Sequence, residues 1–160
     1  MKSRLVVPDA SVVIKFFIPE VLSDQAVEIL TLVQRGEIGL VAPYLLYCET
    51  GNILWKKRKQ GEISSKEATE IIVKILALPM ERTPDSEIVE RAVQISNEWV
   101  PSATVYDSIY IATALSQRAT FVTADNKLAR KISHEHPDFV EYCVPIQEYL
   151  DRRADGDLNK

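Results

Sequence analysis

Four acidic side chains stand at positions where a carboxylate could take part in chemistry, and two of them follow short apolar runs. Asp9 comes after "LVVP" and Asp125 after "FVTA", and each precedes a segment with helical spacing. Either aspartate could cap a helix by accepting a backbone N–H, or could belong to a site at the end of a strand. Taken singly, each residue leaves both interpretations open.

Glu49 is harder to explain as a structural residue. Leu45 and Ile53 flank it at four-residue spacing within a predicted helix, so the carboxylate interrupts an apolar face. An unpaired buried carboxylate costs several kcal/mol, which is comparable with the stability of a small domain. The candidates for compensating this charge are a salt bridge, protonation or a cation. Lys15 or Arg82 could reach one of the acids.

Asp107 also has both a structural and a functional interpretation. Thr104 and Asp107 fit a capping box. Ile111 and Leu115 follow four and eight residues later, which places Asp107 on the stripe that these apolar residues bury. If the four acids converge, their repulsion raises their pKa values unless a divalent cation holds them together. Carboxylate oxygens suit Mg²⁺ or Mn²⁺.

The overall composition predicts one soluble domain. The chain has 160 residues, of which 46% are hydrophobic, enough for a single full core over residues 1–153. The polar residues 154–160 are expected to form a disordered tail. No run approaches the roughly 20 apolar residues that span a membrane, so we expect a cytoplasmic protein. The net charge of −4 means that a polyanion partner would need a local basic surface or a metal.

Short apolar strands alternate with longer helical segments along the chain. This order predicts an α/β fold, with a mainly parallel central sheet of four to five short strands and helices on both faces. Ligands of such sheets bind beyond the carboxyl ends of the strands, where Asp9 and Asp125 should lie. Ser23, Ser64 and Thr83 are predicted N-caps. The predicted strands are 5–7, 38–43, 80–83, 119–125 and 139–145, and the helices are 23–35, 43–61, 64–79, 83–99, 104–118, 126–132 and 146–153.

Four segments together resemble the PIN-domain ribonucleases, and most closely a VapC-type toxin of a toxin–antitoxin pair. "VVPDASVVIKFFIPE" is similar to the opening strand and D-x-S turn of that family, and "YLLYCETGNIL" to its helical glutamate. "VYDSIYIATAL" resembles the segment with its third acid, and "FVTAD" its strand-ending T-x-D. The resemblance runs from Leu5 to about Leu150, and the ordered set is more specific than any one motif.

The resemblance implies a PIN-like fold and a metal-dependent endoribonuclease that hydrolyses RNA phosphodiester bonds. One or two Mg²⁺ or Mn²⁺ ions would activate a water and stabilise the leaving oxygen. Many relatives carry a further acid where this chain has Lys127, so a second ion would be weakly held or arrive with substrate. A cognate antitoxin and a homodimer are further family expectations. The implied catalytic and metal-binding residues are Asp9, Glu49, Asp107 and Asp125, supported by Ser11 and Thr123.

Basic residues near two of the acids are candidate RNA contacts. Lys127, Arg130 and Lys131 lie on a helix that begins beside Asp125, and Lys15 is close in sequence to Asp9. The basic run at 56–59 has a simpler explanation, because cations are favoured at a helix C-terminus.

Histidine and cysteine do not form a convincing metal motif. Cys48 and Cys143 lack the spacing of a zinc site or a disulfide framework. His134 and His136 lie two residues apart at a predicted helix end and would not face one ion, which favours a structural role.

Two other functions remain open from the sequence. An aspartate after the first strand of an α/β sheet can act as a phosphoryl-accepting nucleophile. Haloacid dehalogenase-type hydrolases usually need a second acid two residues later, and Ser11 occupies that place here. The chain could also be a catalytically silent module that binds RNA or metal on a PIN-like fold.

Overall fold

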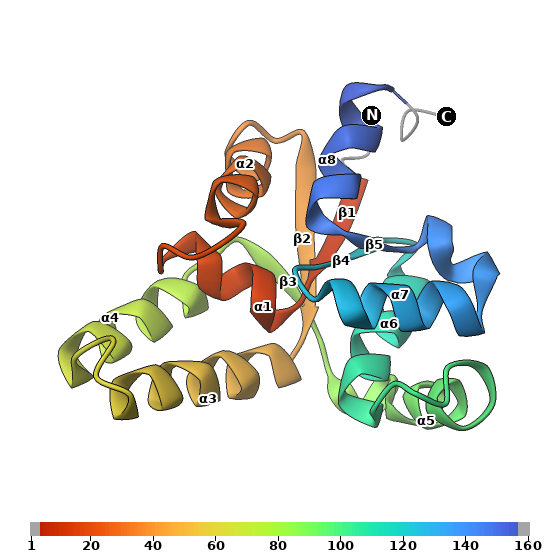
Figure 1. Cartoon of the computed structure of the whole chain (residues 1–160), viewed down its shortest axis with the longest axis horizontal. Coiled ribbons are helices and arrows are strands. Elements are labelled where there is room, and N and C mark those ends of the chain that lie inside the picture. The colour runs from red at the N-terminus through yellow and green to blue at the C-terminus, as the bar shows by residue number, and fades with distance from the viewer. Residues whose placement is uncertain (1–3, 157–160) are drawn as a thin grey trace.

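Five parallel strands form the centre of the computed structural model, which describes residues 4–156 (Figure 1). Their order across the sheet is β3-β2-β1-β4-β5, and every neighbouring pair is parallel. The predicted parallel α/β architecture is therefore confirmed. The strands are β1 (Arg4–Pro8), β2 (Ile38–Pro43), β3 (Met80–Thr83), β4 (Thr120–Thr123) and β5 (Cys143–Pro145).

Four of the strands are short, mostly apolar runs because helices cover both faces of the sheet, whereas the edge strand β3 exposes Glu81 and Arg82. α6 packs on β1, β2 and β4, while α2 and α8 pack on each other and on β2, β4 and β5. α3 and α4 pair as an arm beside the sheet (Figure 1). The helices are α1 (Ala10–Val13), η1 (Ile14–Phe16), α2 (Ser23–Gln34), α3 (Leu45–Lys59), α4 (Ser65–Leu76), η2 (Asp85–Glu87), α5 (Val89–Gln94), η3 (Ile95–Trp99), α6 (Val105–Gln117), α7 (Asn126–Glu135), η4 (Pro137–Glu141) and α8 (Ile146–Ala154).

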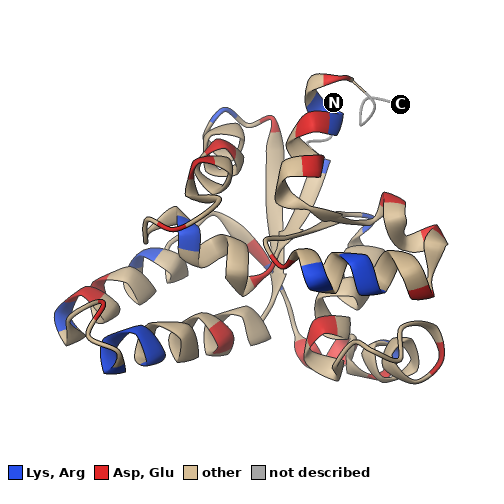
Figure 2. Ribbon diagram, viewed as in Figure 1, with Lys and Arg blue, Asp and Glu red and all other residues tan. Residues whose placement is uncertain are grey.

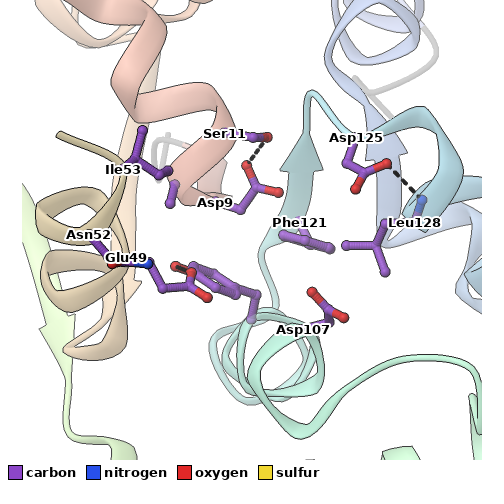
Figure 3. A pocket seen from close by; sticks show the side chains of 11 residues that line it. Asp9, Ser11, Glu49, Asn52, Ile53, Asp107, Phe121, Asp125 and Leu128 are labelled. Atoms are coloured by element: carbon purple, nitrogen blue, oxygen red, sulfur yellow. Dashed lines mark hydrogen bonds between the residues drawn. The ribbon is translucent and has the colours of Figure 1, made fainter. Parts of the chain in front are cut away.

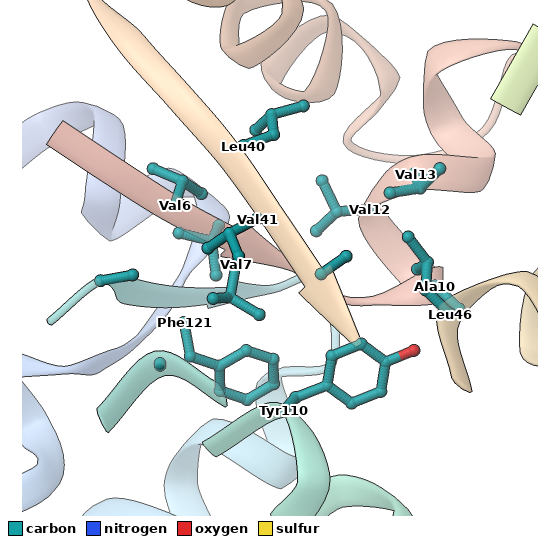
Figure 4. Close-up of a cluster of buried hydrophobic side chains, with 14 of the residues drawn as sticks. Val6, Val7, Ala10, Val12, Val13, Leu40, Val41, Leu46, Tyr110 and Phe121 are labelled. Atoms are coloured by element: carbon teal, nitrogen blue, oxygen red, sulfur yellow. The ribbon is translucent and has the colours of Figure 1, made fainter. Parts of the chain in front are cut away.

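The core surrounds the two central strands. Val6 and Val7 of β1 are fully buried, as is Val41 of β2 (Figure 4). In the register of β1 and β4, Pro8 pairs with Val122. This pairing brings the residues after each strand, including Asp9, to the same edge of the sheet.

The predicted helix over 83–99 is wrong as one continuous element. Pro84 is extended (ψ 131°) and cannot be the first helical residue, while Thr83 ends β3 instead of capping a helix. Asp85 accepts a hydrogen bond from Leu45 N at 3.3 Å, which ties this turn to α3. The rest is a 3-10 turn, the short α5 and a π-helical segment, in which Val100 N bonds to the Ile95 carbonyl.

Several other boundaries differ from prediction, and three of these differences have a structural reason or bear on the chain end. Of the predicted strand 139–145, only Cys143–Pro145 is extended. Pro137–Glu141 forms a 3-10 turn instead, in which the ring of Phe139 stacks on that of His136 with 4.0 Å between the centroids. Ser23 does not cap α2, because its hydroxyl donates back to the Ile18 carbonyl. The predicted tail begins too early, since Ala154 ends α8, and residues 157–160 lie outside the described chain. The predicted N-cap at Ser64 and the predicted capping box at Thr104 are confirmed.

No helix within residues 4–156 combines the length and apolar character that a membrane span requires.

Arg118 ends α6 in the left-handed conformation, with φ of 51°. A residue with a Cβ carries about 1–2 kcal/mol of strain in this conformation, which glycine would not carry. Glycine also gains conformational freedom in the unfolded chain, which lowers the free energy of unfolding by about 0.4–1 kcal/mol. We therefore expect Arg118→Gly to raise the free energy of unfolding by about 0.5–1 kcal/mol. Urea denaturation measures this, and Arg118→Ala should show no such gain because it keeps a Cβ. Equal effects of the two substitutions would contradict the explanation.

Candidate active site

A pocket of about 220 Å³ opens at the carboxyl ends of β1 and β4, and all four predicted acids line it (Figure 3). They come from four separate elements. Asp9 follows β1, Glu49 lies on α3, Asp107 is in the first turn of α6, and Asp125 precedes α7. Segments far apart in the sequence are therefore brought together as predicted.

Asp9 is the most deeply buried of the four acids, with 7% of its surface exposed. Its carboxylate accepts hydrogen bonds from Ser11 Oγ and Thr123 Oγ1, each at 2.5 Å, and from Val12 N at 3.1 Å. Burial raises the pKa of Asp9 to about 6, the nearby charge of Glu49 adds to this, and the three hydrogen bonds oppose it. Asp9 therefore both caps α1 and presents a carboxylate to the pocket.

The two hydroxyls that bond to Asp9 also fix the turn after β4. Ser11 Oγ accepts the N–H of Ala124 at 3.0 Å, and Thr123 Oγ1 accepts the N–H of Asp125 at 2.9 Å. Each hydroxyl thus donates to Asp9 and accepts from the backbone beside Asp125. Ser11 and Thr123 contact the acids as the sequence predicts.

Glu49 accepts a hydrogen bond from the hydroxyl of Tyr110 at 2.5 Å. Burial raises the pKa of Glu49, that hydrogen bond opposes the rise, and the nearby charge of Asp107 adds to it. Tyr110 itself is only 3% exposed, and burial together with Glu49 raises the pKa of its phenol, so it stays a neutral donor. Sequence reasoning missed Tyr110, although it lies three residues after Asp107 on the same helix and hence on a neighbouring face.

Asp107 and Asp125 each use one carboxylate oxygen locally and leave the other without a hydrogen bond from a described residue. Asp107 Oδ2 accepts from the backbone and the side chain of Thr104 at 3.0 and 2.8 Å. Asp125 Oδ1 accepts from the N–H groups of Lys127 and Leu128 at 2.9 and 3.1 Å. Capping and a role in the pocket are therefore compatible for both residues.

No lysine or arginine between residues 4 and 156 forms an ion pair with any of the four acids. Lys15 pairs with Glu20 at 2.7 Å, so it does not reach the pocket acids. Arg82 donates to the Tyr47 hydroxyl and to the Leu76 carbonyl. No salt bridge therefore compensates the charge of Glu49 among these residues. Of the three candidates named from the sequence, protonation and a bound cation remain.

The chemistry of these donors fits a hard divalent cation, although the acids are not already closed around one. Carboxylate oxygens that lack a cationic partner face an open pocket, which is the donor type that Mg²⁺ and Mn²⁺ prefer. Among the described histidine, cysteine, aspartate and glutamate side chains, no group of three is arranged to hold an ion. Contacts through water or a change of rotamer would have to complete the coordination.

Residues 6–132 match the PIN domain family model. The chain belongs to the PIN domain family. Ribonuclease VapC3 of Pyrobaculum aerophilum is 28% identical to it over 130 residues, which cover 80% of this chain and 94% of the relative.

Two solved structures share the fold of this chain. PAE2754 from Pyrobaculum aerophilum superposes with a TM-score of 0.66 at 22% identity, covering 97% of this chain and 99% of that chain. VapC20 of Mycobacterium tuberculosis, described as a sarcin-ricin loop cleaving toxin, superposes with a TM-score of 0.59 at 12% identity, covering 78% and 93%. At these identities the likeness establishes the fold alone.

The basic residues predicted as RNA contacts of this PIN domain divide into two groups. Lys127, Arg130 and Lys131 are exposed on α7, whose first turn bonds to Asp125 (Figure 2). Lys15 instead shares Glu20 with Lys57 of α3. The two ion pairs of Glu20 join the segment after Asp9 to α3, the helix that carries Glu49. Lys15 therefore stabilises the contact between these two segments.

Tyr110→Phe tests how much the short hydrogen bond to Glu49 stabilises the PIN domain. Hydrogen bonds to charged groups contribute about 1.5–3 kcal/mol, so we expect the free energy of unfolding at pH 7 to fall by about 1–2 kcal/mol. Chemical denaturation measures this loss. Tyr106→Phe is the matched control, because Tyr106 is 62% exposed on the same helix and should lose less than about 0.5 kcal/mol. Equal losses for both variants would contradict the inferred role of Tyr110.

Proposed function

We propose that this PIN domain is a metal-dependent endoribonuclease that hydrolyses RNA phosphodiester bonds. The observation that carries the proposal is the convergence of Asp9, Glu49, Asp107 and Asp125 on one pocket without a cationic partner among the described residues. The name of the curated relative, a ribonuclease, agrees with this activity.

The chain supplies positioning and charge for this reaction. One or two Mg²⁺ or Mn²⁺ ions held by the four carboxylates, directly or through water, would supply Lewis acidity toward the phosphate and its attacking water. Ser11 and Thr123 fix the orientation of Asp9, and Tyr110 fixes Glu49. The free oxygens of Asp107 and Asp125 face the same pocket, so each acid keeps an oxygen available after its local bonds are made.

The RNA strand would approach from the α7 side of the pocket. Lys127, Arg130 and Lys131 are exposed there, and lysine and arginine contacts to phosphates supply most of the sequence-independent affinity for nucleic acids. Lys127 also lies two residues after Asp125, so its charge would weaken a second metal position near that acid. Lys15 is withdrawn from the proposed RNA contacts because Glu20 holds it.

The biological setting of the proposed enzyme is that of a toxin controlled by an antitoxin. This part of the proposal rests on the VapC resemblance, which also favours a homodimer. The composition of the chain favours a cytoplasmic location and a single domain, which includes α8 to its end at Ala154. An arginine or lysine of the antitoxin entering the acid pocket would be a natural inhibitor, because it would supply the cationic partner that the acids lack.

The two other functions receive less support from the geometry. A phosphoryl-accepting Asp9 would need an open carboxylate, but both of its oxygens accept hydrogen bonds from Ser11, Thr123 and Val12. A catalytically silent module that binds only RNA would have no need of four acids without cationic partners in one pocket. A silent module that binds metal could use them. Such a module is nevertheless distinguished from an enzyme only by turnover.

RNA cleavage with controlled metal content tests the proposal. The full chain should cleave structured RNA with Mn²⁺ or Mg²⁺, and chelation should abolish cleavage reversibly. Glu49→Gln keeps an acceptor for Tyr110 but removes the charge, so cleavage should fall by at least about 100-fold, since a lost metal interaction is worth several kcal/mol. Glu70→Gln is the control, because Glu70 is exposed on α4 and, within residues 4–156, pairs only with Lys66 at 3.8 Å. Cleavage that survives chelation, or full activity of Glu49→Gln, would overturn the proposal.

A further inference from the structure

A second cavity, of about 760 Å³, lies at the opposite end of the sheet from the acid pocket. Its lining includes Arg4 at the start of β1, Thr120 at the start of β4 and Tyr142 immediately before β5. Because the strands are parallel, these amino ends are separated from Asp9 and Asp125 by the length of the strands. The cavity is within the range of about 300–1,000 Å³ that is typical of small-molecule sites.

Three arginines line this cavity, against one glutamate, Glu141. Arg4 and Arg118 make no ion pair with any described residue. Arg152 is held in place by Glu148 and by the Val140 carbonyl. The three arginines come from β1, the end of α6 and α8, so the fold itself gathers the positive charge.

The hydroxyl of Tyr149 gives a second, independent indication of an anionic ligand. Tyr149 is only 1% exposed and lines the same cavity, yet its hydroxyl finds no hydrogen-bond acceptor among residues 4–156. Burial raises the pKa of Tyr149, while the charge of Arg153, donation from its guanidinium to the phenol oxygen and the charge of Arg4 oppose the rise. These guanidinium neighbours cannot accept its proton, so the hydroxyl is a donor without an acceptor. Buried polar groups are normally satisfied, which points to a missing acceptor in the cavity.

We propose that this cavity binds the phosphate group of a nucleotide, either free or within an RNA strand. Guanidinium groups match the geometry of phosphate oxygens, and two unpaired arginines with a buried hydroxyl supply a convergent set of donors. The ring of Tyr142, 42% exposed beside them, offers a face on which a base can stack. The site does not depend on the ribonuclease proposal, since it shares no residue with the acid pocket.

Binding of adenosine 5′-monophosphate and of a 5′-phosphorylated trinucleotide RNA to the full chain tests this inference. The measurements are made by calorimetry without divalent ions, so that the acid pocket repels both probes. Arg118→Gly removes one guanidinium and is expected to stabilise the fold, so a loss of binding would not reflect unfolding. It should weaken binding by about 10-fold or more, as expected for one charge-assisted hydrogen bond.

Tyr149→Phe should weaken binding by about 10-fold, as expected for one hydrogen bond to a charged acceptor, with no fall in the midpoint of thermal unfolding. Arg35→Gln is the control, because Arg35 is exposed and lies outside the cavity. Weakened binding of both probes supports a site for free nucleotides, and weakened binding of the trinucleotide alone supports a site for an RNA strand. Failure of both probes to bind, or equal binding by wild type and the two cavity variants, would overturn the proposal.

Discussion

Asp9→Asn is expected to abolish RNA cleavage and, at the same time, to make the metal-free protein more stable at neutral pH. Asparagine is nearly the same size and can still accept hydrogen bonds from Ser11 and Val12, so the local structure should persist. The negative charge that would hold a cation is lost. Cleavage should therefore fall by at least about 100-fold, since a metal contact is worth several kcal/mol to the reaction.

The stability gain follows from the direction of the pKa shift of Asp9. Burial raises the pKa from 3.8 to about 6, so between these pH values the folded protein keeps a proton that the unfolded chain releases. This contribution to stability is fully present below pH 3.8 and is lost as the pH rises to about 6. The loss is at most about 3 kcal/mol, at about 1.4 kcal/mol for each pKa unit.

Urea denaturation at pH 4 and pH 7 in the presence of a chelator measures this effect. Asp9→Asn should raise the free energy of unfolding at pH 7 by about 1–2 kcal/mol, because the weakened hydrogen bond with Thr123 costs about 1 kcal/mol of the gain. Asp24→Asn, at an exposed position on α2, is the control and should change little. A destabilised Asp9→Asn protein at pH 7 would contradict the inferred cost of the buried charge.

Phe121→Ala is expected to be the most destabilising single truncation near the site. Phe121 is fully buried in β4, and its ring stacks on Tyr110 with 5.8 Å between centroids (Figure 4). Truncation of a buried phenylalanine costs about 3–5 kcal/mol, and a domain has only about 5–15 kcal/mol in total. The cavity left by the truncation would also remove the ring on which Tyr110 stacks. The hydrogen bond from Tyr110 to Glu49 would then be weakened.

Urea denaturation of the variant measures that loss directly. Phe121→Leu should lose less than Phe121→Ala, because it keeps most of the buried volume. Val21→Ala is the surface control, since Val21 is 83% exposed and should change stability by less than about 0.5 kcal/mol. A loss below about 1 kcal/mol for Phe121→Ala would show that β4 is not packed as described.

The architecture was predictable because local signals agree with the global fold. All strands except the edge strand β3 are mostly apolar runs, and their alternation with helices favours a parallel sheet. The acid pocket was predictable because Glu49 interrupts an apolar helix face and Asp9 ends a strand. A buried carboxylate at either place lowers the stability of the fold unless something compensates its charge, so each one required an explanation.

Features that depend on long-range contacts could not be predicted. Tyr110 looks like an ordinary core residue, and only the fold shows that Glu49 receives its hydroxyl. The break after Thr83 depends on the contact of Asp85 with α3 rather than on helix propensity. The ion pair of Lys15 could not be foreseen either, because its partner Glu20 also binds Lys57 from another helix.

The hydrogen bond between Thr123 and Asp9 has a consequence for protein synthesis. The two residues are 114 positions apart, and Asp125 follows Thr123 closely. β4, which carries Thr123, inserts beside β1 only after most of the chain has left the ribosome. A nascent chain therefore carries Asp9 and Glu49 long before their partners exist. On the proposed function, an unfinished toxin cannot cut the RNA of the ribosome that is making it.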